Sequence, residues 1–159
     1  IIFWNGIEMI NIPIQRLSQN PSLPLPTYAT LGSAGCDLCA DIEQTIFLKP
    51  GMRTLVPTGY AIALPDGYEA QIRPRSGLAL HHGITVLNSP GTIDADYRGL
   101  ISVILINHGA DIFEITSCMR IAQMVIAPII QVTFNSVQTL PKTTRATSGF
   151  GSTGTGILP

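Results

Sequence analysis

Short apolar segments separated by glycine and proline turns dominate this chain. Turn-forming residues recur at Pro50-Gly51, Pro57-Thr58-Gly59, Pro65-Asp66-Gly67 and Ser89-Pro90-Gly91. The segments between them have strand length: 68–73 and 101–106 are β-prone, and 111–116 alternates after a turn. Many short strands divided by such turns are typical of an all-β jelly roll, sandwich or barrel. We therefore expect an all-β fold of the jelly-roll or β-barrel-like kind.

One segment, 76–83, is expected to form a short helix. Ser76 is a candidate N-cap, good helix formers follow, and Gly83 is a candidate C-terminal stop. Arg75 stands immediately before it, so an arginine and the unsatisfied N–H groups of a helix start converge. Such a start can bind an anion. A plain connector helix is the equal alternative from spacing alone.

The composition bounds the class of protein. The 159 residues fit one domain with a real core, and 45% of them are hydrophobic while only 12% are charged. No apolar run approaches the roughly 18 residues of a membrane span. We therefore expect no membrane association, and an oligomer that buries extra apolar surface between subunits.

Charge and cysteine content exclude other classes. The net charge is −1 with no basic block, so we expect no nucleic-acid partner. The three cysteines, Cys36, Cys39 and Cys118, form no disulfide pattern. On a strand, residues three apart point to opposite faces, so Cys36 and Cys39 would chelate zinc poorly. Free thiols and the lack of a basic leader favour a cytoplasmic protein.

The chain divides into three parts by composition. Residues 1–8 are interpreted as an upstream extension or expression remnant, because a more regular sequence begins at Met9. Residues 9–140 form the β domain, and 141–159 form a glycine-rich C-terminal arm. The stretch 148–156 is either a disordered tail or a mobile arm whose glycines approach phosphate closely.

Polar chemistry concentrates in the segment 91–99. Asp94, Asp96, Tyr97 and Arg98 lie there between two glycines. A tight turn of this kind can gather a base, an aromatic platform and backbone groups around one small ligand. From the residues alone, Asp94 could instead cap a turn, and Tyr97 could be an ordinary core aromatic.

Five motifs follow one another in a recognisable order. They are Ala34-Gly35-Cys36-Asp37-Leu38-Cys39-Ala40, Pro74-Arg75-Ser76-Gly77-Leu78-Ala79, Asn88 with 91–99, Arg120-Ile121-Ala122-Gln123-Met124-Val125, and 145–154. In order and spacing they resemble the trimeric dUTP diphosphatase (dUTPase) family over nearly the whole chain after Met9. The resemblance implies a jelly-roll homotrimer whose three active sites are each shared by three subunits. Motifs one, two and four would come largely from one chain, motif three from a second and the arm from a third. It also implies Mg²⁺-assisted hydrolysis of dUTP to dUMP and pyrophosphate, which keeps uracil out of DNA and supplies dUMP for dTTP synthesis.

The resemblance assigns roles to particular residues. Asp94 would activate the water that attacks the α-phosphorus, and an ordinary aspartate is already ionised at pH 7. Tyr97 would exclude a 2′-hydroxyl, while the uracil would be read by Asn88, Gly91, Thr92, Ile93 and the Asp94 backbone. The phosphates would be held by Arg75, Ser76, Gly77 and Gln123. The arm would contribute Arg145, Phe150, Gly151, Ser152 and Thr153, with Phe150 stacked on uracil. Asp37 would orient the waters of Mg²⁺ from its outer shell.

Two departures and two rival functions remain. Leu100 stands where the family often has Glu, and Arg145-Ala146-Thr147-Ser148-Gly149 replaces a more glycine-rich start of motif five. A dCTP deaminase of related fold, possibly bifunctional, is the nearest rival, although such chemistry usually needs a glutamate and motif three has only aspartates. A non-catalytic trimeric module that binds dUTP or a protein partner is the rival from another class.

Overall fold

The chain is almost entirely β-structure. A computed structural model describes residues 2–4 and 7–149, with side chains from Ile10 onward. Within these residues there are thirteen strands and a single α-helix. The elements are β1 (Ile2–Trp4), β2 (Ile7–Met9), β3 (Ile14–Arg16), β4 (Cys36–Cys39), β5 (Ile46–Leu48), β6 (Arg53–Pro57), β7 (Tyr60–Ile62), β8 (Tyr68–Arg73), α1 (Ser76–His82), β9 (Ile84–Val86), β10 (Gly91–Ile93), β11 (Ser102–Asn107), β12 (Phe113–Ile115) and β13 (Arg120–Pro128).

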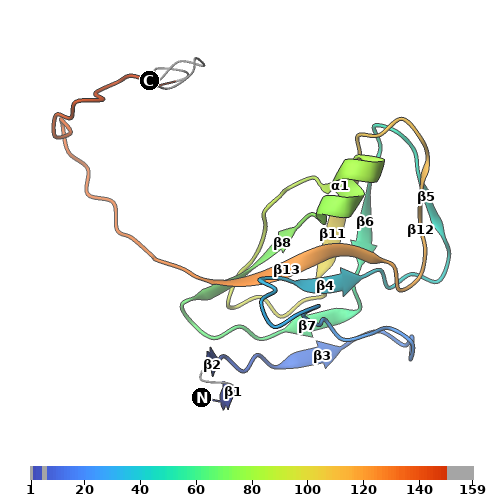
Figure 1. Cartoon of the computed structure of the whole chain (residues 1–159). Coiled ribbons are helices and arrows are strands. Elements are labelled where there is room, and N and C mark those ends of the chain that lie inside the picture. The colour runs from blue at the N-terminus through green and yellow to red at the C-terminus, as the bar shows by residue number, and fades with distance from the viewer. Residues whose placement is uncertain (1, 5–6, 150–159) are drawn as a thin grey trace.

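Two larger sheets enclose the core (Figure 1). One has the order β10-β8-β13-β4 and the other β6-β11-β9, and every pairing is antiparallel. Three two-stranded pairs, β1-β2, β12-β5 and β3-β7, complete the described part. Apolar side chains from both larger sheets meet in one cluster, so the molecule is a sandwich of the jelly-roll type. The all-β prediction with one short helix is confirmed.

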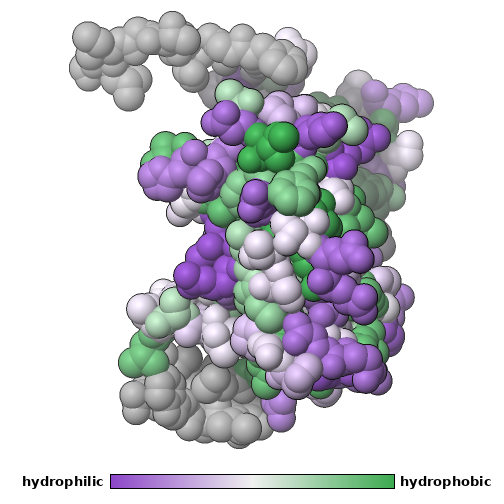
Figure 2. All heavy atoms as spheres, turned by 90° about the vertical axis from the view of Figure 1, so that its right-hand side faces the viewer, coloured by the Kyte–Doolittle hydropathy of each residue, from purple (hydrophilic) through white to green (hydrophobic). Residues whose placement is uncertain are grey.

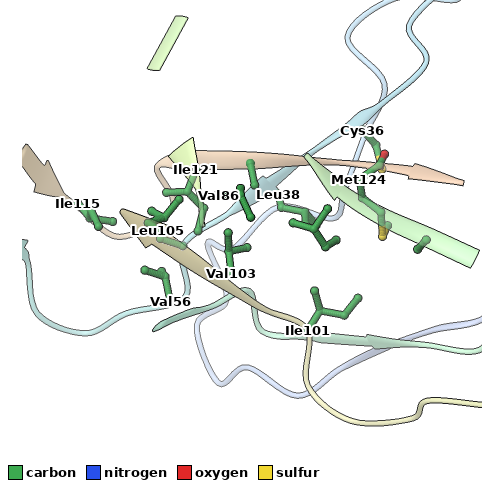
Figure 3. Close-up of a cluster of buried hydrophobic side chains, with 14 of the residues drawn as sticks. Cys36, Leu38, Val56, Val86, Ile101, Val103, Leu105, Ile115, Ile121 and Met124 are labelled. Atoms are coloured by element: carbon green, nitrogen blue, oxygen red, sulfur yellow. The ribbon is translucent and has the colours of Figure 1, made fainter. Parts of the chain in front are cut away.

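Strand β11 shows how the sequence pattern builds this core. Val103, Leu105 and Asn107 are buried, whereas the alternate residues are only partly buried. Figure 3 shows Val103 and Leu105 among the side chains of the core cluster. Asn107 is tolerated inside because Nδ2 donates to the carbonyls of Leu48 (2.9 Å) and Asp111 (2.8 Å). Its Oδ1 accepts from the Gly109 N–H at 2.8 Å, so the buried amide is fully paired.

The structure tests the expected elements individually. The segment 68–73 coincides with β8, 101–106 is shifted by one residue to β11, and 111–116 contains the shorter β12. The helix is present, and Gly83 ends it in the left-handed conformation with φ of 67°. The expectation that Ser76 caps this helix was wrong. Extended backbone continues from β8 through Arg75, which is the N-cap, so Ser76 is already helical and there is no side-chain cap.

The cysteines of β4 point to different surroundings. Cys36 belongs to the main core, whereas Cys39 packs with Leu23 and Tyr60 in a second cluster. This is the opposite-face geometry expected for residues three apart on a strand. Burial raises the pKa of both thiols, so each is held as the neutral thiol at pH 7.

Surface features bear on assembly and on the ends of the chain. Figure 2 shows hydrophobic side chains reaching the surface between hydrophilic ones on the face to the right of Figure 1. Among the described residues, no helix combines the length and apolarity that a bilayer crossing requires. After Pro128 the chain runs away from the sheets without helix or strand up to Gly149 (Figure 1). The predicted boundaries at residues 8/9 and 140/141 stay predictions.

Candidate active site

A cavity of about 390 Å³ opens beside strands β10 and β11. It is lined by Leu55, Ile72, Val86, Asn88, Gly91, Thr92, Ile93, Asp94, Tyr97, Leu100, Ser102, Val103 and Ile104. Six of these are residues that the sequence predicted for base, sugar and water recognition: Asn88, Gly91, Thr92, Ile93, Asp94 and Tyr97. The cavity therefore gathers the whole described part of motif three that was assigned to the substrate.

Strand β10 places the polar wall of this cavity. It pairs with β8 in the register Gly91↔Ile72, which buries Gly91 at the strand start. A Cβ on Gly91 would lie 3.1 Å from Nδ2 of Asn88 and 3.3 Å from Cβ of Ile72. Both contacts are tighter than ordinary van der Waals packing. The glycine therefore lets the Asn88 amide lie against the β10 backbone, where both can face one ligand.

The turn after β10 is held by its own hydrogen bonds. The Tyr97 N–H donates to the Asp94 carbonyl at 3.1 Å, and the Tyr97 hydroxyl donates to the Leu100 carbonyl at 3.1 Å. Nη1 of Arg98 donates to the carbonyls of Ala95 (2.6 Å) and Tyr97 (2.9 Å). Arg98 is thus occupied by the turn itself. The Asp94 carboxylate is exposed at the cavity and makes no hydrogen bond with any other described residue.

A cluster of charged side chains, here called the Asp37 cluster, lies where β4, β13 and the start of α1 meet. It consists of Asp37, Arg75 and Arg120. Oδ1 of Asp37 accepts from Nε of Arg75 at 2.9 Å, and Oδ2 accepts from Nη1 of Arg120 at 3.1 Å. Nη1 of Arg75 also donates to the Arg120 carbonyl at 3.3 Å. Two guanidinium groups share one carboxylate, so the Asp37 cluster carries one excess positive charge. That balance suits a bound anion.

Gln123 joins this group through the sheet. It pairs with Asp37 across β13 and β4, and Nε2 donates to the Pro74 carbonyl at 2.9 Å. A Cβ on Gly35 would lie 2.5 Å from Oε1 of Gln123, so a larger residue there would displace the end of this side chain. The places of Gly35 and Asp37 in motif one are consistent with these neighbours. Ser76 and Gly77 follow at the first turn of α1.

Comparison with known proteins identifies the source of this arrangement. Residues 22–154 match the dUTPase family model. The chain belongs to the dUTPase family. It is accordingly an enzyme that hydrolyses dUTP, a dUTP diphosphatase.

Solved dUTPases share the fold. The structure of the Staphylococcus bacteriophage 80alpha dUTPase with dUpNHpp aligns with a TM-score of 0.81 at 23% identity, covering 92% of this chain and 99% of that one. An aspartate-to-glutamate mutant of the phage 80alpha enzyme gives 0.78 at 25% identity, covering 89% and 98%. The dUTPase from phage phi11 of S. aureus gives 0.72 at 22%, covering 82% and 98%. The agreement extends over nearly the full length of each of those chains.

Not all predicted site residues of this dUTPase come together in one chain. Asp37, Arg75, Ser76, Gly77 and Gln123 do not line the cavity. Arg145 lies on the segment that runs away from the sheets, and its Nε donates to the Ser148 carbonyl at 3.1 Å. The remaining predicted positions, Phe150, Gly151, Ser152 and Thr153, lie outside the described residues.

The structure adds residues that the sequence did not assign to the site. Arg120 shares Asp37 with Arg75, and its place at the head of motif four was the available signal. Leu55, Leu100 and Ile104 supply an apolar wall of the cavity. Ile104 lies on the outward face of β11 and pairs with Leu55 on β6. Apolar residues at outward positions of these strands could have indicated this wall from the sequence.

Proposed function

We propose that this dUTPase binds the uracil and deoxyribose of dUTP in the 390 Å³ cavity and cleaves the nucleotide with a water activated by Asp94. The observation that carries the proposal is the convergence of Asn88, the β10 backbone, Asp94 and Tyr97 on one cavity. Its volume lies within the roughly 300–1,000 Å³ range of small-molecule pockets. Attack of the water at the α-phosphorus releases dUMP and pyrophosphate.

The polar wall supports selection of the base and sugar. The Asn88 amide and the backbone groups of Thr92, Ile93 and Asp94 can pair with the uracil edge, and a site built on such hydrogen bonds discriminates against cytosine. Gly91 permits the close approach of Asn88 on which this pairing depends. Tyr97 lines the same cavity and would pack against deoxyribose, leaving no room for a 2′-hydroxyl.

Asp94 has the properties needed of the general base. Its carboxylate faces the cavity and has no competing hydrogen bond within the described residues. Aspartate carboxylates are normally ionised at pH 7 and can accept a proton from a bound water. The alternative that Asp94 caps its own turn is disfavoured by the bonds there, because the Asp94 carbonyl, not its side chain, accepts the Tyr97 N–H.

The phosphate chain would be held by the Asp37 cluster with its neighbours and by the arm. We place the triphosphate against Arg75, Ser76, Gly77 and Gln123, and we assign Arg145, Gly151, Ser152 and Thr153 to its closure and Phe150 to stacking on uracil. The residues assigned to the phosphates do not line the cavity of the same chain, which supports a homotrimer in which neighbouring subunits complete each site. Exposed apolar side chains at Leu55, Leu87 and Phe47 are available to such contacts.

The donor set fits Mg²⁺ bound through the substrate. No cluster of three His, Cys, Asp or Glu side chains occurs in the described part of the chain, so the protein offers no cage of its own there. Mg²⁺ commonly takes phosphate oxygens and waters, and an aspartate-to-asparagine mutant dUTPase of phage phi11 coordinates a structural Mg(II) ion. Asp37 retains acceptor capacity beside its two arginine contacts, so it can order such waters. Bound Mg²⁺ would neutralise phosphate charge.

A pyrophosphate-release assay tests the function directly. With Mg²⁺ we expect release from dUTP and little from dTTP, dCTP or UTP, and a strong loss of rate with dUTP when Mg²⁺ is chelated. Ammonia release from dCTP would instead indicate the deaminase rival, although no glutamate lines the cavity. Binding of dUTP without pyrophosphate release would favour a non-catalytic trimeric module. The cytoplasmic location and the absence of nucleic-acid and membrane partners stay predictions.

A further inference from the structure

The ring of Tyr97 lies directly against Gly99. A Cβ built on Gly99 would overlap the Tyr97 hydroxyl oxygen, and it would lie 2.6 Å from Cζ and 3.0 Å from Cε2 of the same ring. Real Cβ atoms essentially never approach other atoms below 3.0 Å. All three nearest atoms belong to Tyr97, so any side chain at position 99 collides with this ring first.

The backbone of Gly99 does not itself require glycine. Its φ lies outside the left-handed region, unlike that of Gly51, Gly59, Gly67 and Gly83. An L-residue could therefore adopt the conformation of position 99 without backbone strain. The need for glycine there comes from the space that Tyr97 occupies.

Other contacts of the turn hold the hydroxyl and the backbone of the same residue. The Tyr97 hydroxyl donates to the Leu100 carbonyl, and the Tyr97 N–H donates to the Asp94 carbonyl. Arg98 holds the Tyr97 carbonyl through Nη1. The side chain is 44% exposed, so burial in the core does not account for its position. Its hydroxyl bonds to the Leu100 carbonyl, and its ring fills the space left by the missing side chain at position 99.

We propose that Gly99 is a positioning residue that sets the orientation of the Tyr97 ring and thereby the selectivity of this dUTPase for deoxyribose. The inference rests on the proposed contact between Tyr97 and the sugar. A methyl group at position 99 forces the ring to rotate and to give up the Leu100 carbonyl. The ring then no longer closes the space that a 2′-hydroxyl would need. The kcat/KM for UTP therefore rises relative to that for dUTP, because selectivity is a difference in transition-state binding between the two substrates.

Five variants test this position by steady-state kinetics on dUTP and UTP. Gly99→Ala introduces the collision, and Tyr97→Leu removes the ring atoms with which the new Cβ collides. The double variant combines them, and Gly32→Ala is the matched control because a Cβ there meets nothing within 4 Å. Thermal unfolding of each variant verifies that the fold is intact. Tyr97→Phe separately removes the bond to the Leu100 carbonyl.

The expected readout is the ratio of kcat/KM for dUTP to that for UTP. We expect Gly99→Ala to lower this ratio by about tenfold or more, the range in which a fitted pocket discriminates between similar substrates. Tyr97→Leu should lower it at least as much, and Tyr97→Phe by about two- to tenfold, the value of one hydrogen bond. In the Tyr97→Leu background, Gly99→Ala should add less than about twofold, because the two positions act as one unit. Gly32→Ala should leave the ratio unchanged.

Two different results overturn two different statements. If Tyr97→Leu leaves the ratio at the wild-type value, the proposed sugar contact is wrong, and the selectivity role of Gly99 falls with it. If Tyr97→Leu lowers the ratio but Gly99→Ala does not, the sugar contact stands and the positioning role is overturned. An equal loss from Gly99→Ala with and without the Tyr97 ring also overturns it, because position 99 would then act independently of Tyr97.

Discussion

The turn of residues 94–100 and the segment 129–149 show opposite kinds of organisation. The turn follows a strand of the main sheet, and its backbone and side chains bond to one another through Tyr97, Arg98 and the Asp94 carbonyl. The segment has no helix or strand, and the hydrogen bonds within it join only residues three apart, around Arg145. Its Phe134 side chain is 95% exposed.

The difference indicates how the work of the site is divided. A binding wall that discriminates between bases and sugars benefits from rigid hydrogen-bond donors. Mobile donors must be ordered when the ligand binds, and this cost reduces both affinity and selectivity. A closing element must open to admit substrate and release product, so weak contacts with its own chain suit it. We therefore expect catalysis to depend on both regions and folding to depend on only one.

The largest effect is expected from removing the base in the rigid region. Asp94→Asn should keep dUTP binding and slow hydrolysis by about 10²–10⁴-fold, because general-base catalysis contributes that much. Asp96→Asn, two residues away and outside the cavity lining, is the matched control and should retain most activity. Single-turnover rates and nucleotide binding measure both effects. Full activity in Asp94→Asn would place the base elsewhere.

Large stability effects should be confined to the sheets. Leu105→Ala removes a fully buried side chain of β11 and should cost about 2–5 kcal/mol in the free energy of unfolding. Phe134→Ala in the exposed segment should change it by less than about 0.5 kcal/mol. Urea unfolding monitored by circular dichroism compares the two. Equal losses would show that 129–149 belongs to the folding core.

Truncation before Ser148 should separate folding from catalysis. The shortened chain should keep its unfolding midpoint and its oligomeric state, because the removed residues follow a segment with little buried surface. We expect kcat/KM to fall by about 10–10²-fold, the scale of lost positioning. Unfolding of the truncated chain would contradict the closing-arm interpretation, and unchanged kinetics would remove its catalytic role.

A smaller effect is expected from Arg75 in the Asp37 cluster, which is assigned to the phosphates. Arg75→Lys loses the fork that contacts both Asp37 and the Arg120 carbonyl, and KM for dUTP should rise by about tenfold. Arg73→Lys is the matched control, because Arg73 is exposed and its Nε bonds only to Gln71 among the described residues. An equal rise in both variants would show that the fork contact of Arg75 with Asp37 is not the cause of the effect.

Much of the fold was readable from the sequence because strands and turns have local signals. Segment 68–73 alternates between turn residues, and the helix is closed by a glycine, so β8 and Gly83 were placed correctly. The grouping of Asn88 with 91–97 was also predictable, since these residues are close in sequence. The N-cap assignment failed because Ser76 fits a local rule that the extended backbone of Arg75 overrides.

Interactions between distant segments were not readable in the same way. The pairing of Arg120 with Asp37 follows from the register of β13 against β4, which joins residues 83 positions apart. The apolar wall formed by Leu55 and Ile104 depends on the pairing of β6 with β11. The close approach of the Tyr97 ring to Gly99 is local in the sequence. It depends on the direction of one ring, however, and no spacing rule predicts that direction.

The central claim is that the rigid cavity of one subunit is completed by the arm of another. Mixing two impaired variants tests it most directly: Asp94→Asn with an intact arm, and a chain truncated before Ser148 with an intact Asp94. After co-expression and purification of mixed trimers, about one third of the sites should combine Asp94 of one chain with the arm of another, because each mixed cyclic trimer holds one such site in three. We predict that pyrophosphate release from dUTP recovers to about that fraction of the wild-type rate. Mixed trimers no more active than the sum of the two separate variants would contradict the account.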